Sequence, residues 1–222
     1  MISSIHYIQL EARKIVVKQS PSYTWWSLAD SHTSLIGDKI FLNGVNSASI
    51  RGGRVSHIRM FLEKHGFFKG KMSHVFLTCG GNDLDGGVPA RVANELLDLI
   101  YEIRKFDKNC TVITGTIISR RGTYDNEDAY IKKVYELDRQ MVQTMGHHHF
   151  LTDVWVDDCD RNGPAKLRKE LYIYDGIHLN PAGREILLDV FMFLIGSANR
   201  GDYSNRKYWN YKGSTRSIFW KF

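Results

Sequence analysis

Cysteine is scarce in this sequence, which contains only Cys79, Cys110 and Cys159. Their number is odd, they lie far apart, and no two form a C-x-x-C pair. The sequence therefore has neither the framework of a disulfide-rich protein nor the usual spacing of a zinc site or redox dithiol. We expect a domain that folds without covalent cross-links, in a reducing compartment.

Long apolar runs are also missing. No run reaches the roughly 18 residues that a membrane helix needs, which argues against a transmembrane segment. The first 18 residues are interrupted by His6, Glu11 and Arg13, and a signal peptide would have an uninterrupted apolar stretch there. The sequence therefore predicts an intracellular, cytoplasmic protein.

Internal repeats and low-complexity linkers are absent as well. Since 43% of the 222 residues are apolar, the chain has enough apolar residues to bury one substantial core. We expect one domain over residues 1–197, with an N-terminal extension over about residues 1–22, and a separate tail over residues 198–222.

What the sequence does carry is a positive charge, with a formal net value of +6. Such a charge favours association with nucleic acid or other anions. From Ala198 onward, basic and aromatic residues are interleaved: Arg200, Tyr203, Arg206, Lys207, Tyr208, Trp209, Tyr211, Lys212, Arg216, Phe219, Trp220 and Lys221. This tail either holds RNA or single-stranded DNA through phosphate contacts and base stacking, or packs its rings against the domain. The packing interpretation is favoured.

Two kinds of apolar segment alternate along the chain. Stretches rich in β-forming residues predict strands over residues 23–29, 44–50, 74–79, 110–118 and 150–156. Apolar residues at helical spacing predict helices around residues 55–62 and 92–103, over 127 to about 144, and from Pro181 onward with Asn180 as the N-cap. This alternation predicts a three-layer α/β/α, flavodoxin-like domain around a parallel sheet of about five strands.

Residues suited to catalysis follow these predicted strands, where open parallel sheets bind their ligands. Ser31 follows the first strand and could be an exposed nucleophile. Gly52 follows the second strand and could bring a backbone N–H to a developing oxyanion, while Asn82 follows the third and offers an amide donor. Asp175 precedes His178 by three residues, so its carboxylate could orient the imidazole.

In this order, A-D-S at residues 29–31, the glycine at 52, G-G-N-D at 80–83 and D-G-I-H at 175–178 resemble the sequence blocks of the SGNH (GDSL-like) hydrolase family. The resemblance covers about residues 25–194, and Ala29 replaces the glycine of the G-D-S block. It implies an SGNH hydrolase fold in which Ser31 is the nucleophile, His178 the base and Asp175 its partner. The oxyanion donors would be the backbone N–H groups of Ser31 and Gly52 and the side chain of Asn82.

The resemblance further implies a serine esterase acting on a small or lipid-like ester, with no metal or cofactor. Taken singly, each residue has a structural explanation: Ser31 as a helix cap, Gly52 and Asn82 as turn residues, and His178 as a surface histidine. Their ordered combination favours catalysis. Asp30 and Asp83 are expected to support the site by capping helices or holding loops.

Other polar residues are ambiguous. Arg120 and Arg121 follow the fourth predicted strand, where they either reach an anionic group of the substrate or lie in a solvated loop. The histidines at 147–149 cannot converge on one metal ion, because consecutive residues of a strand point to opposite faces, and we expect a solvated start of a strand. Cys79 is expected to be buried and inert.

Two other functions stay open. One is an SGNH scaffold that binds RNA, with weak or no esterase activity. Esterase domains of some LINE-type retrotransposons and the SGNH-like domain of Oskar are similar, and the latter binds RNA without the catalytic residues. The other is an assembly domain within a larger polyprotein. Because a pure binder has no need of Ser31, Asp175 and His178 together, the sequence favours the enzyme. It predicts neither the acyl group, nor the alcohol, nor the oligomeric state.

Overall fold

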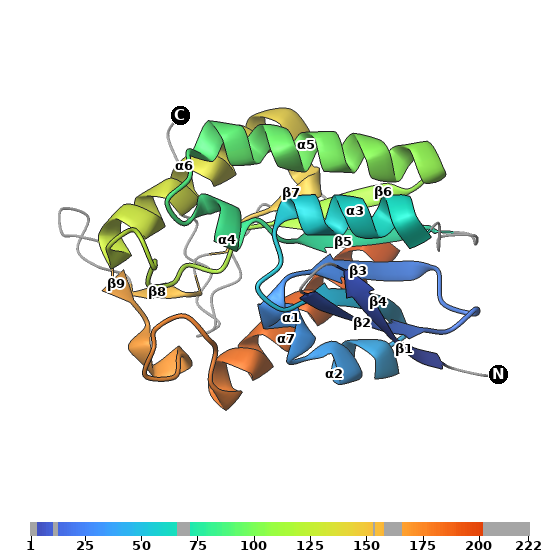
Figure 1. Ribbon diagram of the computed structural model, residues 1–222, viewed down its shortest axis with the longest axis horizontal. Helices are drawn as coiled ribbons and strands as arrows, with labels where there is room; N and C mark the ends of the chain where they lie inside the picture. Colours follow the sequence, from blue (N-terminus) through green and yellow to red (C-terminus); the bar gives the residue numbers. More distant parts are fainter. Residues whose placement is uncertain (1–3, 11–12, 66–71, 153, 158–165, 202–222) are drawn as a thin grey trace.

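A seven-stranded sheet, in the order β1-β2-β4-β3-β5-β6-β7, forms the centre of the molecule (Figure 1). The computed structural model describes residues 4–10, 13–65, 72–152, 154–157 and 166–201. Five neighbouring strands are parallel, from β4 through β3, β5 and β6 to β7. The α/β class and the parallel sheet that the sequence predicts are confirmed.

Four of the parallel strands lie where the sequence predicts them: β3 (Trp25–Ala29), β4 (Val45–Ile50), β5 (His74–Thr78) and β6 (Thr111–Gly115). The prediction of a fifth strand over residues 150–156 is wrong in its extent. β7 covers only His149–Phe150, while β8 (Val156–Asp157) pairs with β9 (Lys166–Leu167) outside the sheet. Val154 and Trp155 lie between these strands in a turn, and both are buried. Their apolar side chains therefore pack into the core although this part of the chain does not pair as a strand.

An antiparallel hairpin extends the sheet at one edge, and the sequence did not predict it. β1 (Ser4–Leu10) pairs with β2 (Arg13–Gln19), and β2 pairs antiparallel with β4. Ile15 and Val17 alternate toward the core and are fully buried, as expected of a strand with one buried face. Lys18 forms an ion pair with Asp38.

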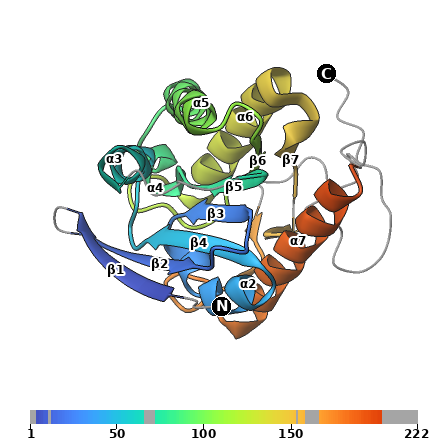
Figure 2. The same ribbon diagram turned by 90° about the vertical axis from the view of Figure 1, so that its right-hand side faces the viewer.

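Helices cover both faces of the sheet, as Figure 2 shows. One face is covered by α3 (Val55–His65), α5 (Pro89–Phe106) and α6 (Glu127–Met145), and the other by α2 (Gly37–Leu42) and α7 (Pro181–Asn199). Asn180 caps α7 by accepting a hydrogen bond from Gly183 N at 3.0 Å, which confirms the predicted cap. Short helices α1 (Ser31–Ser34) and α4 (Gly81–Leu84) directly follow β3 and β5.

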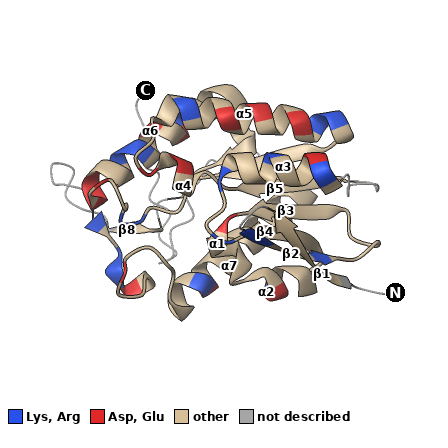
Figure 3. Ribbon diagram, in the orientation of Figure 1, with Lys and Arg blue, Asp and Glu red and all other residues tan. Residues whose placement is uncertain are grey.

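Charged residues of both signs are mixed along α5 (Figure 3), so this helix carries no continuous basic surface. Across the residues that the structure describes, no helix is both long and apolar enough to span a bilayer. The tail from residue 202 to 222 lies outside the described residues.

Candidate active site

Residues that follow three neighbouring strands lie at one edge of the sheet. β4, β3, β5 and β6 are neighbours and run parallel, so their carboxyl ends share an edge. In the sheet, β4 lies on one side of β3 and β5 on the other, so the direction in which successive strands are added reverses at β3. Such a reversal opens a crevice for ligands at the carboxyl ends of the strands. Ser31 begins α1 directly after β3, Gly52 lies in the turn after β4, and Asn82 lies in α4 after β5.

Asp175 and His178 form a hydrogen-bonded pair. The Asp175 Oδ2 atom lies 2.8 Å from His178 Nδ1, and Oδ1 accepts from the backbone N–H of Ile177 at 2.8 Å and of His178 at 2.9 Å. Partial burial alone would raise the pKa of Asp175, but these three hydrogen bonds hold it below its ordinary value. The carboxylate is therefore ionised, and its bond to Nδ1 leaves the other ring nitrogen of His178 for proton transfer.

The loop that carries this pair is tied to the end of the sheet. Its base closes through a bridge between Tyr172 and Leu179, and the Tyr172 hydroxyl donates to the carbonyl of Ser119. At its tip, Gly176 has a positive φ of 66° and its carbonyl accepts from Arg121 N at 2.8 Å. Arg121 thus supports the loop through its backbone, while its side chain is exposed.

His32 connects this loop with the start of α1. Its ring centroid lies 6.1 Å from that of His178, and it directly follows Ser31 in sequence. The side chain of His178 is 46% exposed, whereas His32 is buried. Burial, together with the nearby Arg120 and His178, lowers the pKa of His32 to about 3. A neutral imidazole therefore lies beside His178 and the Ser31 backbone.

Asn82 is held in one orientation by bonds at both ends of its amide. Nδ2 donates to the carbonyl of Gly53 at 2.8 Å, and Oδ1 accepts from Arg120 Nη2 at 2.9 Å. The bond to Gly53 joins Asn82 to the turn that contains Gly52, whose φ is +58°. A Cβ atom at position 52 would also lie 2.5 Å from Arg13 Nη1, so the Arg13 side chain would have to shift.

Arg120 is a buried part of the site's framework, so the expectation of a solvated loop is wrong for this residue. It is 6% exposed, and Nη2 also donates to the carbonyl of Gly81 at 3.0 Å. Nε donates to the Tyr130 hydroxyl at 3.4 Å, and the carboxylate of Asp85 lies 3.7 Å away. Its guanidinium is therefore engaged within the protein, where it positions Asn82.

The two aspartates next to the predicted catalytic residues cap helices. Asp30 is the N-cap of α1 and accepts from His32 N at 3.2 Å, and Asp83 accepts from Val55 N at 3.1 Å at the start of α3. Burial raises the pKa of Asp30 to about 6 and also raises the pKa of Asp83. Asp30 thus holds the start of α1, where Ser31 lies, and Asp83 joins α4, which contains Asn82, to the start of α3.

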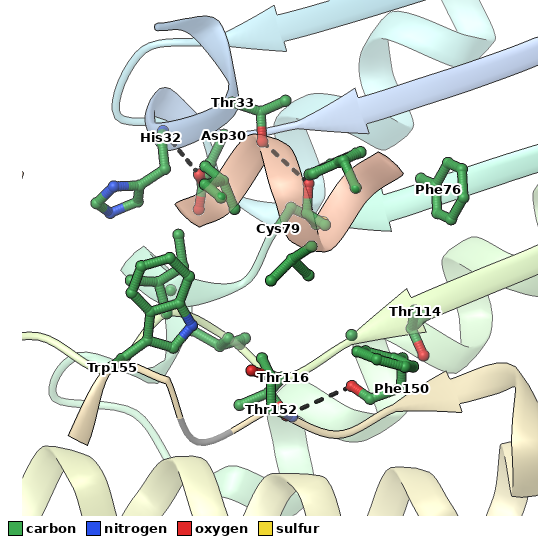
Figure 4. Close-up of a pocket in the computed structure, with 18 of the residues that line it drawn as sticks. Asp30, His32, Thr33, Phe76, Cys79, Thr114, Thr116, Phe150, Thr152 and Trp155 are labelled. Carbon is green, nitrogen blue, oxygen red and sulfur yellow. Dashed lines mark hydrogen bonds between the residues drawn. The ribbon is translucent and has the colours of Figure 1, made fainter. Parts of the chain in front are cut away.

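A cavity begins at these residues and runs between the sheet and α7 (Figure 4). Ser31, His32 and Asn82 line it, together with residues of β5, β6, β7 and α7, and its volume is about 50 Å³. Figure 4 shows His32 and Trp155 beyond the strand ends and Phe76 farther along the sheet. This cavity could not be predicted from the sequence, because its walls come from elements far apart in the chain.

The structure contradicts the sequence interpretation of His149. This residue is buried, with Nδ1 2.7 Å from the Thr114 hydroxyl and Nε2 2.9 Å from the Asp138 carboxylate. The expectation of a solvated start of a strand is therefore wrong for His149. Among the described side chains, no group of three His, Cys, Asp or Glu could hold a metal ion.

Cys79 is buried, and burial together with Asp30 and Asp83 raises the pKa of its thiol well above the usual value. The expectation that Cys79 is buried is therefore confirmed, and its inertness stays a prediction that the raised pKa supports, because a protonated thiol is a poor nucleophile. Cys159 lies outside the described residues.

The geometry defines a class of protein. A three-layer α/β/α domain presents a serine, an amide side chain and an Asp–His pair at the carboxyl edge of its parallel sheet, and this is the architecture of the SGNH-type hydrolase fold. Residues 19–186 match the model of the GDSL-like Lipase/Acylhydrolase family, and the chain belongs to this family. No curated protein matches the sequence significantly.

Solved structures show the same fold. A Streptococcus pneumonia protein whose name refers to platelet activating factor has a TM-score of 0.62 at 18% identity, over 78% of this chain and 84% of its own. A GDSL-like lipase from Bacteroides thetaiotaomicron has a TM-score of 0.61 at 15% identity, over 78% and 87%. The C-terminal domain of Drosophila Oskar has a TM-score of 0.59 at 13% identity, over 80% and 92%.

Proposed function

We propose that this protein is a serine esterase that hydrolyses a carboxylic ester, with Ser31, His178 and Asp175 as its catalytic triad. The observation that carries the proposal is the 2.8 Å contact between His178 and Asp175, in a loop beside the start of α1, where Ser31 follows β3. Membership of a lipase/acylhydrolase family supports the same reaction class.

The reaction would proceed by acyl transfer. His178 accepts the proton of the Ser31 hydroxyl while Oγ forms a bond to the ester carbonyl carbon, and the carbonyl oxygen becomes an oxyanion. The C–O bond to the alcohol then breaks, and His178 returns the proton to the leaving alkoxide. A water molecule repeats the attack on the acyl-enzyme, releases the acid and restores Ser31.

Three donors would stabilise the oxyanion: the backbone N–H groups of Ser31 and Gly52 and the side chain of Asn82. The amide of Asn82 has two N–H bonds, of which one is used by Gly53. Because Arg120 binds the amide oxygen, the nitrogen cannot exchange places with it. The second N–H would therefore be available to the oxyanion without reorganisation, which is how such donors lower a barrier.

Labelling of the nucleophile tests the proposal. The full chain would be treated with a serine-reactive p-nitrophenyl phosphonate and assayed with p-nitrophenyl acetate. We expect the label on Ser31, and we expect Ser31→Ala to lower kcat/KM by at least about a thousandfold. Ser56→Ala, an exposed serine on α3, is the matched control and should retain full activity. A label on another residue, or activity that survives Ser31→Ala, would overturn the proposal.

A further inference from the structure

The cavity beside Ser31 has one end at the proposed site and the other inside the domain. At the first end it is lined by Ser31 and Asn82. At the other end it reaches Phe76 of β5, whose ring packs edge-on against Phe191 of α7 with centroids 5.6 Å apart. Both rings are about 1% exposed, so they close the cavity.

The wall that α7 contributes is apolar, formed by Leu187, Val190, Phe191 and Leu194. On the facing side, the hydroxyls of Thr114 and Thr116 are bonded to His149 and Asp138 and are therefore occupied. An occupant that enters from Ser31 thus meets hydrocarbon on most sides, which suits an aliphatic chain.

Size limits that chain. The cavity volume is about 50 Å³, and a space of roughly 10–15 Å³ on the same measure holds one water-sized group. The cavity therefore accommodates about three to five such groups. Beyond a carbonyl carbon placed at Ser31, this corresponds to the chain of a butyryl to hexanoyl group, whereas an octanoyl chain is too long.

Among the described residues of the wall, two buried ring nitrogens have no hydrogen-bond partner: Nδ1 of His32, next to Ser31, and Nε1 of Trp155. Only the indole Nε1–H of Trp155, which is 1% exposed, is a donor in every protonation state. Buried donors without a partner are rare in folded proteins. An acyl chain with an oxygen substituent would supply the missing acceptor.

We propose that this cavity is the acyl site of the enzyme, and that it selects short acyl groups carrying a hydrogen-bond acceptor, such as 3-hydroxybutyryl. The proposal rests on the esterase function proposed above. The carbonyl carbon lies at Ser31, the chain extends between the sheet and α7, and Trp155 donates to the substituent.

Chain-length profiles test the size limit. With p-nitrophenyl esters from acetate to octanoate, we expect kcat/KM of the wild type to fall at least about tenfold beyond hexanoate, since one misfitting methylene in a pocket has an effect of this order. Phe191→Leu enlarges the closed end and should raise octanoate relative to butyrate about tenfold. Val190→Phe fills the cavity and should lower butyrate relative to acetate. Met192→Phe, on the exposed side of α7, is the size-matched control.

A pair of equally sized esters tests the role of Trp155. We expect the wild type to prefer p-nitrophenyl 3-hydroxybutyrate over 3-methylbutyrate, in which a methyl group replaces the hydroxyl, by about tenfold. Trp155→Phe should abolish this preference and keep the length limit.

Phosphonate labelling of Ser31 distinguishes the two proposals. If Ser31 is not labelled, the esterase function itself fails. If Ser31 is labelled but the wild type hydrolyses octanoate as fast as butyrate, or Phe191→Leu and Met192→Phe give the same profile, the acyl site is overturned. An equal rate for the two branched esters in the wild type would remove the acceptor preference. Should Val190→Phe not fold, Phe191→Leu decides the size limit.

Discussion

Asp30 is a buried carboxyl group next to the proposed nucleophile, and its protonation couples the site to stability. Its pKa is about 6 in the folded protein, against an ordinary value of 3.8. Between these two values the folded state binds more protons than the unfolded state, so the contribution of Asp30 to stability is present below pH 4 and is lost as the pH rises through 6. The loss amounts to roughly 3 kcal/mol at most.

Asp30→Asn should remove this dependence, because asparagine keeps a cap acceptor and does not titrate. We expect the free energy of unfolding of the wild type to fall relative to that of Asp30→Asn between about pH 4 and pH 6. Urea titrations of both proteins from pH 4 to pH 8 measure the difference, in which the other titrating groups cancel. Parallel profiles would contradict the assignment.

Arg120 acts on the proposed reaction through Asn82, and kinetics can separate this role from a purely structural one. Arg120→Lys keeps the charge near Asp85 but loses the planar fork that reaches Gly81 and Asn82 together. We expect kcat to fall about tenfold with little change in KM, and Asn82→Ala to lower kcat about a hundred- to a thousandfold.

The double variant Arg120→Lys with Asn82→Ala supplies the decisive comparison. If Arg120 acts only by positioning the Asn82 amide, Arg120→Lys should have no further effect on kcat once Asn82 is alanine. The kcat of the double variant should then equal that of Asn82→Ala alone. Losses that multiply in the double variant would show that Arg120 acts independently of Asn82.

At the level of single residues, the sequence predicted the contacts that depend on short spacing. Asp175 and His178 lie three positions apart, so one tight loop pairs them. The burial of Arg120 could not be predicted from the sequence. Its partners are Gly81 of α4, Tyr130 of α6 and Asp85, which lie far from it along the chain.

Among the elements, β7 is short, and a buried hydrogen bond attaches it to α6. His149 of β7 pairs with Asp138 of α6, and Asp138 also accepts from the Thr116 hydroxyl at 2.8 Å. Asp138→Ala leaves Nε2 of His149 without its partner, whereas the Thr116 hydroxyl keeps its bonds to Phe150 O and Thr152 N. One buried polar group without a partner costs about 1–3 kcal/mol, so we expect a loss of this size in unfolding free energy, measured by urea denaturation. Arg139→Ala, at an exposed position of the same helix, is the control. An equal loss of stability in Asp138→Ala and Arg139→Ala would contradict a stabilising role of the bond between His149 and Asp138.

Long elements with a strong period were predictable, and short or edge elements were not. The buried stripe of α6, which includes Ile131, Val134 and Leu137, recurs at helical spacing over several turns. The hairpin of β1 and β2 has Glu-Ala between its strands in place of the Asn-Gly or Asp-Gly that marks a tight turn. β7 has only two residues, too few to show any period.

At the scale of the whole molecule, the order of the strands explains how distant segments form one site. Ser31 follows β3, and the Asp175–His178 loop precedes α7, which returns across the face of the sheet that the cavity occupies. The first and last parts of the domain thus supply the proposed nucleophile and its proposed base, and α7 supplies the wall of the proposed acyl site. The alternation of strand and helix patterns in the sequence predicted the α/β fold class, whereas the cavity could be found only in the packed structure.

The sequence of the tail favours packing of its rings against the domain and leaves open a second role, the binding of single-stranded RNA by its interleaved basic and aromatic residues. Removal of the residues beyond Gly201 tests this second role. A chain ending at Gly201 keeps all of α7 and loses Arg206, Lys207, Lys212, Arg216 and Lys221. If each contacts one phosphate, the slope of log K against log salt should be smaller by about 3.5 in the shorter chain, because each contact with a single strand contributes about 0.7.

Fluorescence anisotropy with a labelled oligouridine, between 50 and 200 mM salt, measures both slopes. Replacing Tyr208, Trp209 and Tyr211 by alanine in the full chain keeps every charge, so it should weaken binding through lost stacking and leave the slope unchanged. Equal, negligible binding by the full and shortened chains would rule out RNA binding by the tail. Esterase activity of the shortened chain should equal that of the full chain, because every residue of the proposed site precedes Gly201.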